Sequence, residues 1–359
     1  MKTVRVSLGS GSYEIRIGPG LLAGVGRWLK ESGFPGRLVI VTDPAVNGFH
    51  GQALARRLAA EGFEAVALVV PAGEEQKTLE TVGRLYAELT AARAERGTPV
   101  LALGGGVIGD LGGFVAATYY RGVPLLQLPT TLLAQVDSSI GGKVAVDHGQ
   151  LKNKIGTFYQ PRLVVADIDA LKTLPAEEMA NGMAEVIKSA AIGDRAFFTY
   201  LEKNVGLVKG LDPEVLEEVV FRTARIKAGV VEKDERDMGL RGILNFGHTV
   251  GHAVESVSGF GVKHGGAVAI GMVAAARISA GMGLLAGSEV SRLIDIIRRA
   301  GLPTSMKGLD VPAAMAAMRH DKKVRQDKIR FVLLNSIGSA FIADDVSPEL
   351  VKKVLEGNE

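Results

Sequence analysis

The stretch Val100-Leu-Ala-Leu-Gly-Gly-Gly-Val-Ile-Gly-Asp110 decides the fold of this chain. A short apolar run leads into Gly104, Gly106 and Gly109, which have the GxGxxG spacing, and a helical pattern follows. Glycines at the end of a buried strand let the backbone approach a pyrophosphate, while the next helix offers unpaired N–H groups. A tight turn without a ligand is the alternative, because the acidic residue of a dinucleotide site, expected about 20 positions further on, is missing.

Strand-like and helix-like segments alternate on both sides of this stretch. Residues 4–6 and 13–17 have the pattern of a hairpin, and residues 79–93 have helical periodicity. Further apolar runs, each followed by polar or turn-forming residues, occupy positions 38–42, 65–70, 124–128 and 163–166. Short buried strands that alternate with helices predict a parallel sheet covered on both faces.

Longer helical periods dominate the second half of the chain. They cover residues 175–192, 213–231, 247–258, 265–282 and 289–300, with a late strand pair at 331–334 and 340–342. The sequence therefore predicts an α/β nucleotide-binding domain, residues 1–170, followed by a mainly α-helical domain, residues 171–359, that binds metal and substrate.

Length and composition narrow the class of protein. The 359 residues carry a net charge of only +3, so we expect no nucleic-acid partner. The N-terminus lacks the apolar core of a signal peptide, and no run reaches the ~18 apolar residues of a membrane span. We therefore expect a soluble cytoplasmic protein without a membrane partner. Cysteine is absent, so a metal site has to use histidine and carboxylate ligands.

Histidines are concentrated in one region. The stretch Asn245-Phe-Gly-His248-Thr-Val-Gly-His252 holds two of the six, and His264 follows. Residues four apart share one face of a helix, so His248 and His252 can reach a common point. A neutral imidazole is the commonest metal ligand, which favours a metal site. Two core histidines that satisfy each other or the backbone are the alternative.

A charged pair interrupts the apolar segment Met183-Ala-Glu185-Val-Ile-Lys188. A surface ion pair between residues three apart is the simple interpretation. A buried charge, however, needs compensation. Glu185 with His248 and His264 would give a His-His-carboxylate site with an open position, which is typical of catalytic zinc.

Several loops follow the predicted strands with residues suited to an anionic ligand. Glu74 and Lys77 can meet ribose and phosphate oxygens, and Thr130 and Thr131 lie at another strand end. Basic residues cluster in the glycine-rich linking region, at Arg121, Lys143, Lys152 and Lys154. Ordinary solvated surface loops are the alternative for each, but their joint occurrence favours a dinucleotide together with a phosphorylated substrate.

Taken together, these stretches resemble the 3-dehydroquinate synthase family of sugar-phosphate cyclases, which is related to the metal-dependent glycerol and alcohol dehydrogenases. The resemblance covers almost the whole chain, from about residue 39 to residue 334. It rests on ordered motifs, namely PAGEEQK, GGGVIGD, LPTTLLAQVDSSIGGK, LKNKIGTFYQP, NGMAEVIK, LRGILNFGHTVGHAVE and a late DKK.

The resemblance implies residues for each ligand. A divalent metal, zinc or cobalt, is expected on Glu185, His248 and His264. The residues expected to hold NAD are Asp43, Ala72, Gly73, Glu74, Glu75, Gln76, Lys77, Gly106, Val107, Ile108, Gly109, Asp110, Thr130, Thr131, Lys143, Lys152, Ala170, Leu171, Lys172 and Thr173.

The resemblance likewise implies contacts to a sugar phosphate substrate. The expected phosphate contacts are Arg121, Asn153, Asn245, His252 and one of Lys322 and Lys323. Lys227 and Arg241 would meet a carboxylate, and Asp137 and Lys188 would meet ring hydroxyls. His252 then handles phosphate and protons and is no metal ligand. Asp237 departs from the family, which more often has Glu there.

The implied activity is a lyase reaction that uses NAD without consuming it: hydride leaves carbon 5 of 3-deoxy-D-arabino-heptulosonate 7-phosphate, phosphate is eliminated, hydride returns, and an aldol closure yields 3-dehydroquinate. A homodimer is expected. Another sugar-phosphate cyclase and a metal-dependent polyol dehydrogenase are the alternatives. A non-catalytic NAD sensor would have no need of the three metal ligands.

Overall fold

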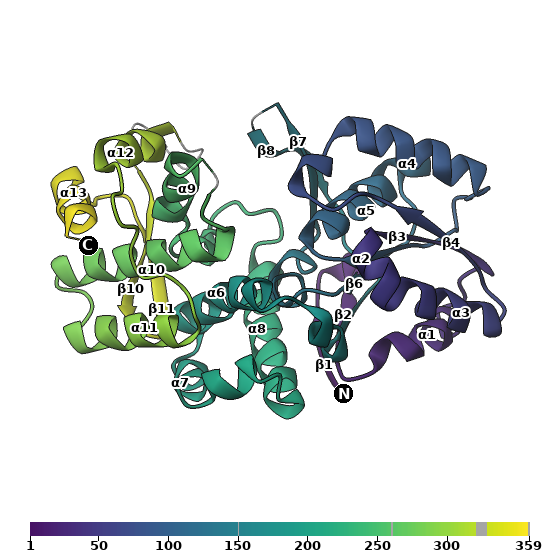
Figure 1. Ribbon diagram of the computed structural model, residues 1–359, viewed down its shortest axis with the longest axis horizontal. Coiled ribbons are helices and arrows are strands. Elements are labelled where there is room, and N and C mark those ends of the chain that lie inside the picture. The colour runs from purple at the N-terminus through teal and green to yellow at the C-terminus, as the bar shows by residue number, and fades with distance from the viewer. Residues whose placement is uncertain (150, 260, 321–328, 358–359) are drawn as a thin grey trace. The chain divides into compact units, whose positions relative to one another are not determined.

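The computed structural model describes residues 1–149, 151–259, 261–320 and 329–357, and the chain divides into two compact units (Figure 1). The first unit comprises Met1–Pro175 and Leu216–Arg236, and the second comprises Ala176–Val215 and Asp237–Glu359. This division differs from the two contiguous domains expected from the sequence, 1–170 and 171–359. Most of helix α8, Pro213–Lys233, returns to the first unit.

Polar contacts fasten α8 to the N-terminal strands. The Lys2 ammonium contacts the Glu218 carboxylate, and Ser7 donates its backbone N–H to Glu232 at 2.6 Å. These partners lie 216 and 225 positions apart in the chain. A pattern of local periodicity carries no information on such pairings, which is why the sequence placed α8 in the second domain.

A seven-stranded sheet forms the centre of the first unit, with the order β1-β2-β9-β6-β5-β3-β4. Strand β1 pairs antiparallel with β2, and the other neighbours pair parallel. The strands are β1 (Lys2–Val6), β2 (Tyr13–Gly18), β3 (Arg37–Thr42), β4 (Glu64–Val69), β5 (Val100–Gly104), β6 (Leu125–Pro129) and β9 (Leu163–Asp167). The expected α/β fold is confirmed.

Helices cover both faces of this sheet (Figure 1). Val39 and Val41 of β3 face a core with α4 (Leu79–Ala91) and α5 (Gly106–Thr118). The alternate residues of β3 face a second core with α1 (Val25–Glu31) and α3 (Gln52–Ala60). Because successive side chains of a strand point to opposite faces, an unbroken apolar run supplies both cores.

The lysine-rich region between β6 and β9 forms a separate hairpin, where the sequence had indicated only a linking loop. Strand β7, Lys143–His148, pairs antiparallel with β8, Leu151–Phe158. Val144 and Val146 are buried in the core beside α5, Ala145 and Asp147 are partly exposed, and Lys143 and His148 are exposed. Alternation of buried and more exposed positions is typical of a half-buried strand.

The second unit is mainly helical. It includes four of the five expected helical segments, and most of the fifth, α8, belongs to the first unit. Helices α6 (Ala176–Gly193), α9 (His248–Val257), α10 (His264–Gly281) and α11 (Gly287–Arg299) match their expected positions to within a few residues. The strand pair β10 (Phe331–Ser336) and β11 (Ser339–Ala343) is also present. Three helices were not predicted, namely α7 (Arg195–Lys209), α12 (Val311–His320) and α13 (Pro348–Glu356).

Helix α10 lies in the core of the second unit and is buried on nearly all sides. It contacts α9 closely because both helices have glycine at the crossing: a Cβ on Gly271 would lie 1.8 Å from the Gly247 carbonyl oxygen and 2.8 Å from the Gly251 nitrogen. Despite this apolar core, no helix in the described part of the chain is long and apolar enough to cross a bilayer.

We expect Gly271→Ala to destabilise the protein by about 3 kcal/mol or more, because its Cβ would meet backbone atoms that cannot rotate away. Urea unfolding followed by far-UV circular dichroism measures the change. Gly206→Ala is the matched control: Gly206 lies on α7 in the same unit, and its Cβ would meet nothing within 4 Å. That substitution should stabilise by roughly 0.5–1 kcal/mol. Equal unfolding midpoints for the two variants would contradict the close helix crossing.

Candidate functional site

Three side chains in the second unit converge as a metal-binding group. Glu185 comes from the middle of α6, while His248 and His264 are the first residues of α9 and α10. One ligand atom from each lies within 4.8 Å of the others. The Glu185 Oε1 atom is 3.8 Å from Nε2 of His248 and 3.8 Å from Nε2 of His264.

The burial and hydrogen bonding of Glu185 are consistent with a cation beside its Oε1 atom. Its side chain is 2% exposed, and Oε1 is a buried oxygen without a hydrogen-bond partner among the described residues. Leaving a buried carboxylate oxygen unpaired is costly, so such an atom indicates a ligand. A zinc ion with bonds of about 2.0–2.2 Å holds tetrahedral ligands about 3.4 Å apart, close to the distances found. The donor set of two imidazoles and one carboxylate leaves a position open for substrate.

The other carboxylate oxygen of Glu185 is occupied. Oε2 accepts a hydrogen bond from the Lys188 ammonium, and Lys188 is also buried. The pair is therefore buried. It is not the surface ion pair, contributing little to stability, that was the simple interpretation of the sequence. Lys188 compensates part of the buried negative charge and stands beside the position of the ion.

Ring orientation supports the same assignment for His248. Its Nδ1 atom lies 3.2 Å from the Phe246 carbonyl oxygen, which can only accept. Nδ1 must therefore carry the proton, and Nε2 has its lone pair available for an ion. His252 lies one turn further along α9 and contacts the His248 ring edge to face, with centroids 5.5 Å apart. The three-ligand group found among the described residues does not include it.

Burial and charge act in opposite directions on His264. Burial lowers its pKa, but the hydrogen bond from its ring to Glu255 and the charge of Glu185 outweigh that effect, so the pKa of His264 is raised. The Glu255 carboxylate lies 3.4 Å from Nδ1 of His264. Glu255 was not among the residues expected in the site. It lies seven positions after His248, a spacing that places both residues on the same face of a helix.

The remaining expected substrate residues of the second unit lie close in sequence to these ligands. Arg241, which is buried, and Asn245 belong to the 3₁₀ turn Leu240–Asn245 that precedes α9. Asp237 has a left-handed backbone with φ of 57°. Lys322 and Lys323 lie outside the described residues.

In the first unit, three expected ligand residues meet at one buried ammonium. The Lys77 Nζ atom donates to Asp110 Oδ2 at 2.7 Å and to Asn153 Oδ1 at 2.6 Å, and Glu74 Oε1 lies 3.5 Å away. Lys77 is only 3% exposed. The group joins the turn after β4, the first turns of α5 and the hairpin strand β8. Contacts within the protein therefore hold these three segments together.

This arrangement shifts the pKa of Asp110. Burial raises the pKa of its carboxyl to about 6, although the ammonium of Lys77 acts in the opposite direction. Lys77 itself has a raised pKa, because Asp110 and Glu74 more than offset the effect of its burial.

Other expected residues of the first unit are found at the carboxyl ends of the strands. Asp43 caps the short helix α2 (Pro44–Val46) by accepting from two backbone N–H groups at 3.0 Å. The buried Thr130 hydroxyl has no partner among the described residues, which is consistent with a ligand at the end of β6. Lys227 of α8 donates to Asp137 Oδ1 at 2.5 Å. Thr173 Oγ1 lies 2.8 Å from a ring nitrogen of His50.

The remaining residues of the NAD set are spread over the loops and turns at the same strand ends. Glu75 and Gln76 lie with Glu74 in the turn Glu74–Gln76, and Lys143 and Lys152 lie on the exposed faces of the hairpin. Ala170 to Thr173 belong to the 3₁₀ turn Ile168–Thr173, where Lys172 pairs with Asp169 at 2.7 Å. Arg121, an expected phosphate contact, follows Tyr120, and both have left-handed backbones.

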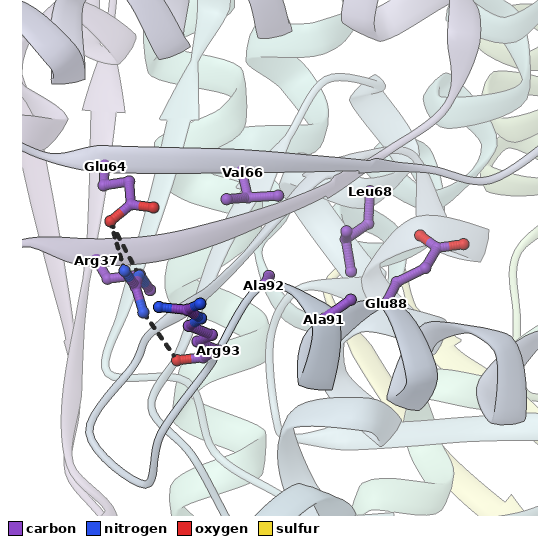
Figure 2. Close-up of a pocket in the computed structure, with 8 residues that line it drawn as sticks. All are labelled: Arg37, Glu64, Val66, Leu68, Glu88, Ala91, Ala92 and Arg93. Atoms are coloured by element: carbon purple, nitrogen blue, oxygen red, sulfur yellow. Dashed lines mark hydrogen bonds and ion pairs between the residues drawn. The ribbon is translucent and has the colours of Figure 1, made fainter.

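A surface hollow of about 500 Å³ lies elsewhere, at the edge strand β4 (Figure 2). There Arg37 pairs with Glu64 at 2.7 Å and donates to the Arg93 carbonyl oxygen at 3.1 Å. Its full lining is Arg37, Glu64, Val66, Leu68, Glu88, Ala91, Ala92 and Arg93. None of the expected ligand residues lines it, so this hollow is not the candidate site.

Comparison with known proteins shows the family of this chain. The family model described as 3-dehydroquinate synthase N-terminal matches residues 67–181, and that described as 3-dehydroquinate synthase C-terminal matches residues 182–324. The chain belongs to the 3-dehydroquinate synthase family. The resemblance drawn from the sequence motifs is thereby confirmed.

Relatives match over essentially the full length. A 3-dehydroquinate synthase from Dehalococcoides mccartyi is 52% identical over 356 residues, which cover 99% of each protein. The structure of 2-epi-5-epi-valiolone synthase from Streptomyces hygroscopicus, with NAD+ and Zn2+ bound, has a TM-score of 0.89 at 30% identity and 98% coverage of both chains. A 2-deoxy-scyllo-inosose synthase complexed with carbaglucose-6-phosphate, NAD+ and Co2+ has a TM-score of 0.91 at 27% identity, with 100% coverage of both.

The buried carboxyl of Asp110 predicts a distinctive dependence of stability on pH. Its pKa is about 6 in the folded chain against an ordinary 3.8, so the folded state holds a proton that the unfolded state has lost. The free energy of unfolding should therefore fall as pH rises from about 4 to about 6, by up to about 3 kcal/mol. Asp110→Asn should lack this fall.

Urea unfolding followed by the fluorescence of Trp28 measures the effect, since this single tryptophan is buried in the first unit. Removing the partner of Lys77 adds an offset that does not depend on pH in this range, so the slope is the test. Parallel pH profiles for the wild-type chain and Asp110→Asn would contradict a raised pKa.

Proposed function

We propose that this chain is a 3-dehydroquinate synthase, which converts 3-deoxy-D-arabino-heptulosonate 7-phosphate to 3-dehydroquinate and phosphate in the shikimate pathway of aromatic amino-acid biosynthesis. The group of Glu185, His248 and His264 carries the proposal, because it provides the donor atoms for a catalytic divalent ion. Full-length relatives that are 44% to 52% identical have this activity in their names. The other cyclases and the polyol dehydrogenases gain no comparable support.

We assign the two cofactors to the two units. The loops at the carboxyl ends of the strands, with the group of Lys77, Asp110 and Asn153, belong to the unit proposed to hold NAD. Glu185, His248 and His264 are proposed to hold zinc or cobalt. When bound, NAD supplies a reversible hydride acceptor, and the ion supplies a Lewis acid for oxygens of the substrate.

The substrate's own charges suit the remaining residues. Lys227 and Arg241 are proposed to bind its carboxylate, because a guanidinium and an ammonium are the natural partners of a buried carboxylate. The proposed phosphate contacts are Arg121, Asn153, Asn245, His252 and one of Lys322 and Lys323. Asp137 and Lys188 are proposed to orient ring hydroxyls, and contacts to Lys227 and Glu185 hold these two side chains in place.

His252 is proposed to handle protons beside the phosphate, since an imidazole can both donate and accept near pH 7. The departing phosphate can serve as the elimination base, which places no demand on a side chain with a strongly shifted pKa. We further expect a homodimer, with Arg121 near the interface, and a cytoplasmic location.

Stoichiometry tests the proposed reaction. The chain supplied with the heptulosonate phosphate and substoichiometric NAD should release many equivalents of phosphate per NAD, with no net NADH at 340 nm, because hydride returns to the substrate. A polyol dehydrogenase would accumulate NADH in proportion to turnover. Accumulation of NADH without phosphate would therefore replace this proposal by that alternative.

Removal of the metal tests the assigned ligands. Dialysis against a chelator should reduce phosphate release at least 100-fold, and added Zn2+ or Co2+ should restore it, since open metal sites supply several kcal/mol of charge stabilisation. His264→Ala should lower turnover similarly, without recovery at micromolar metal. Undiminished turnover after chelation or in His264→Ala would remove the ion from the mechanism.

A further inference from the structure

Glu255 is a buried carboxylate that the reaction proposed above does not use. It lies on α9, two turns beyond His248, and its side chain is 12% exposed. Its Oε1 atom lies 3.4 Å from Nδ1 of His264, the nitrogen on the side of the ring away from the proposed ion. A carboxylate is expensive to bury without a purpose, so this contact calls for a physical account.

The contact determines which nitrogen of His264 can bind a cation. An ionised carboxylate only accepts hydrogen bonds, so Nδ1 must carry the proton. Nε2 then keeps its lone pair and points to the same space as Glu185 Oε1, 3.8 Å away. The Phe246 carbonyl does the same for His248 at 3.2 Å. Both imidazoles are thus held as Nδ1–H tautomers by an acceptor behind them.

His264 needs such a partner more than His248 does. Its side chain is 37% exposed against 12% for His248, so packing restricts it less. It begins α10, whose start is tied to α6 by contacts of Gly265 and Lys263. A charged acceptor on α9 supplies the orientation that packing leaves undetermined.

The charges around the cluster agree with this role. The described groups of the cluster include two carboxylates, Glu185 and Glu255, and one ammonium, Lys188. A divalent cation is more stable beside an ionised Glu255 than it would be if Glu255 were neutral. A carboxylate behind a histidine also raises the basicity of the nitrogen that binds the metal.

We propose that Glu255 is a positioning residue for the divalent ion, which fixes the tautomer and orientation of His264 and strengthens its bond to the metal. The inference rests on the metal site of the proposed function but not on the identity of the substrate.

Cobalt affinity tests the proposal without substrate or NAD. Apo protein is titrated with Co2+ in competition with a chromophoric chelator, for the wild-type chain, Glu255→Ala, Glu255→Gln and Glu255→Asp. Loss of an outer carboxylate partner commonly weakens metal binding 10- to 100-fold, and we expect a loss of that size for Glu255→Ala. Glu255→Gln should lose less, because its amide oxygen still accepts from Nδ1–H, and Glu255→Asp should retain most of the affinity.

A matched control separates this role from general stability. Glu202→Gln removes a carboxylate of the same unit, on α7, that binds Arg292 at 2.6 and 2.8 Å and is not part of the metal-binding group. It should lower the unfolding temperature but leave the Co2+ affinity unchanged within about twofold. The visible absorption of bound Co2+ gives a second measure, and we expect its band shape to change in Glu255→Ala and to stay near wild type in Glu255→Asp.

The outcomes distinguish this inference from the proposed reaction. Glu255→Ala and Glu255→Gln that are folded and bind Co2+ as tightly as the wild-type chain would overturn the positioning role, even if the wild-type chain turns over the heptulosonate phosphate. Weaker Co2+ binding in both variants would support it even if that substrate is refused. A wild-type chain that binds no Co2+ would overturn the inference and the metal site together.

Discussion

A carboxylate enclosed by an apolar helix is the constraint on which the second unit depends. Burying the Glu185 charge without partners would cost several kcal/mol. Lys188 compensates one oxygen, and the helices α9 and α10 bring an imidazole each to the other. Both histidines begin their helices, so their positions depend on how closely α9 and α10 cross. Gly247 and Gly271 permit that crossing, because a Cβ at either position would meet backbone atoms of the other helix.

The first unit solves a similar problem with the opposite sign. There the buried charge is an ammonium, Lys77, and its partners Asp110 and Asn153 come from separate elements. The competition between burial and charge leaves Asp110 with a pKa of about 6. In both units, side chains distant in sequence are joined because an ionised group in a poorly hydrated place needs several partners.

Sequence reasoning succeeded where the signal was local. Apolar runs that end in glycine or polar residues indicated the strands. The four-residue spacing alone paired His248 with His252, and the family motifs indicated Glu185, His248 and His264, which the structure brings together. It failed where the signal was long-range: α8 joins the first unit through pairs such as Lys2 with Glu218. Some omissions were avoidable, since α7 shows Phe197, Leu201 and Val205 at helical spacing behind the capping Asp194. The sequence could predict that Glu255 lies on a helix, but it could not predict the contact between Glu255 and His264.

Because most of α8 belongs to the first unit, that unit is not formed by one continuous segment of the chain. Because Leu216–Arg236 completes a body that begins at Met1, the polypeptide crosses between the two units more than once. A gene fragment that ends at Pro175 would lack a helix that Lys2 and Ser7 contact. Recombination at a single crossover point therefore cannot exchange either unit intact.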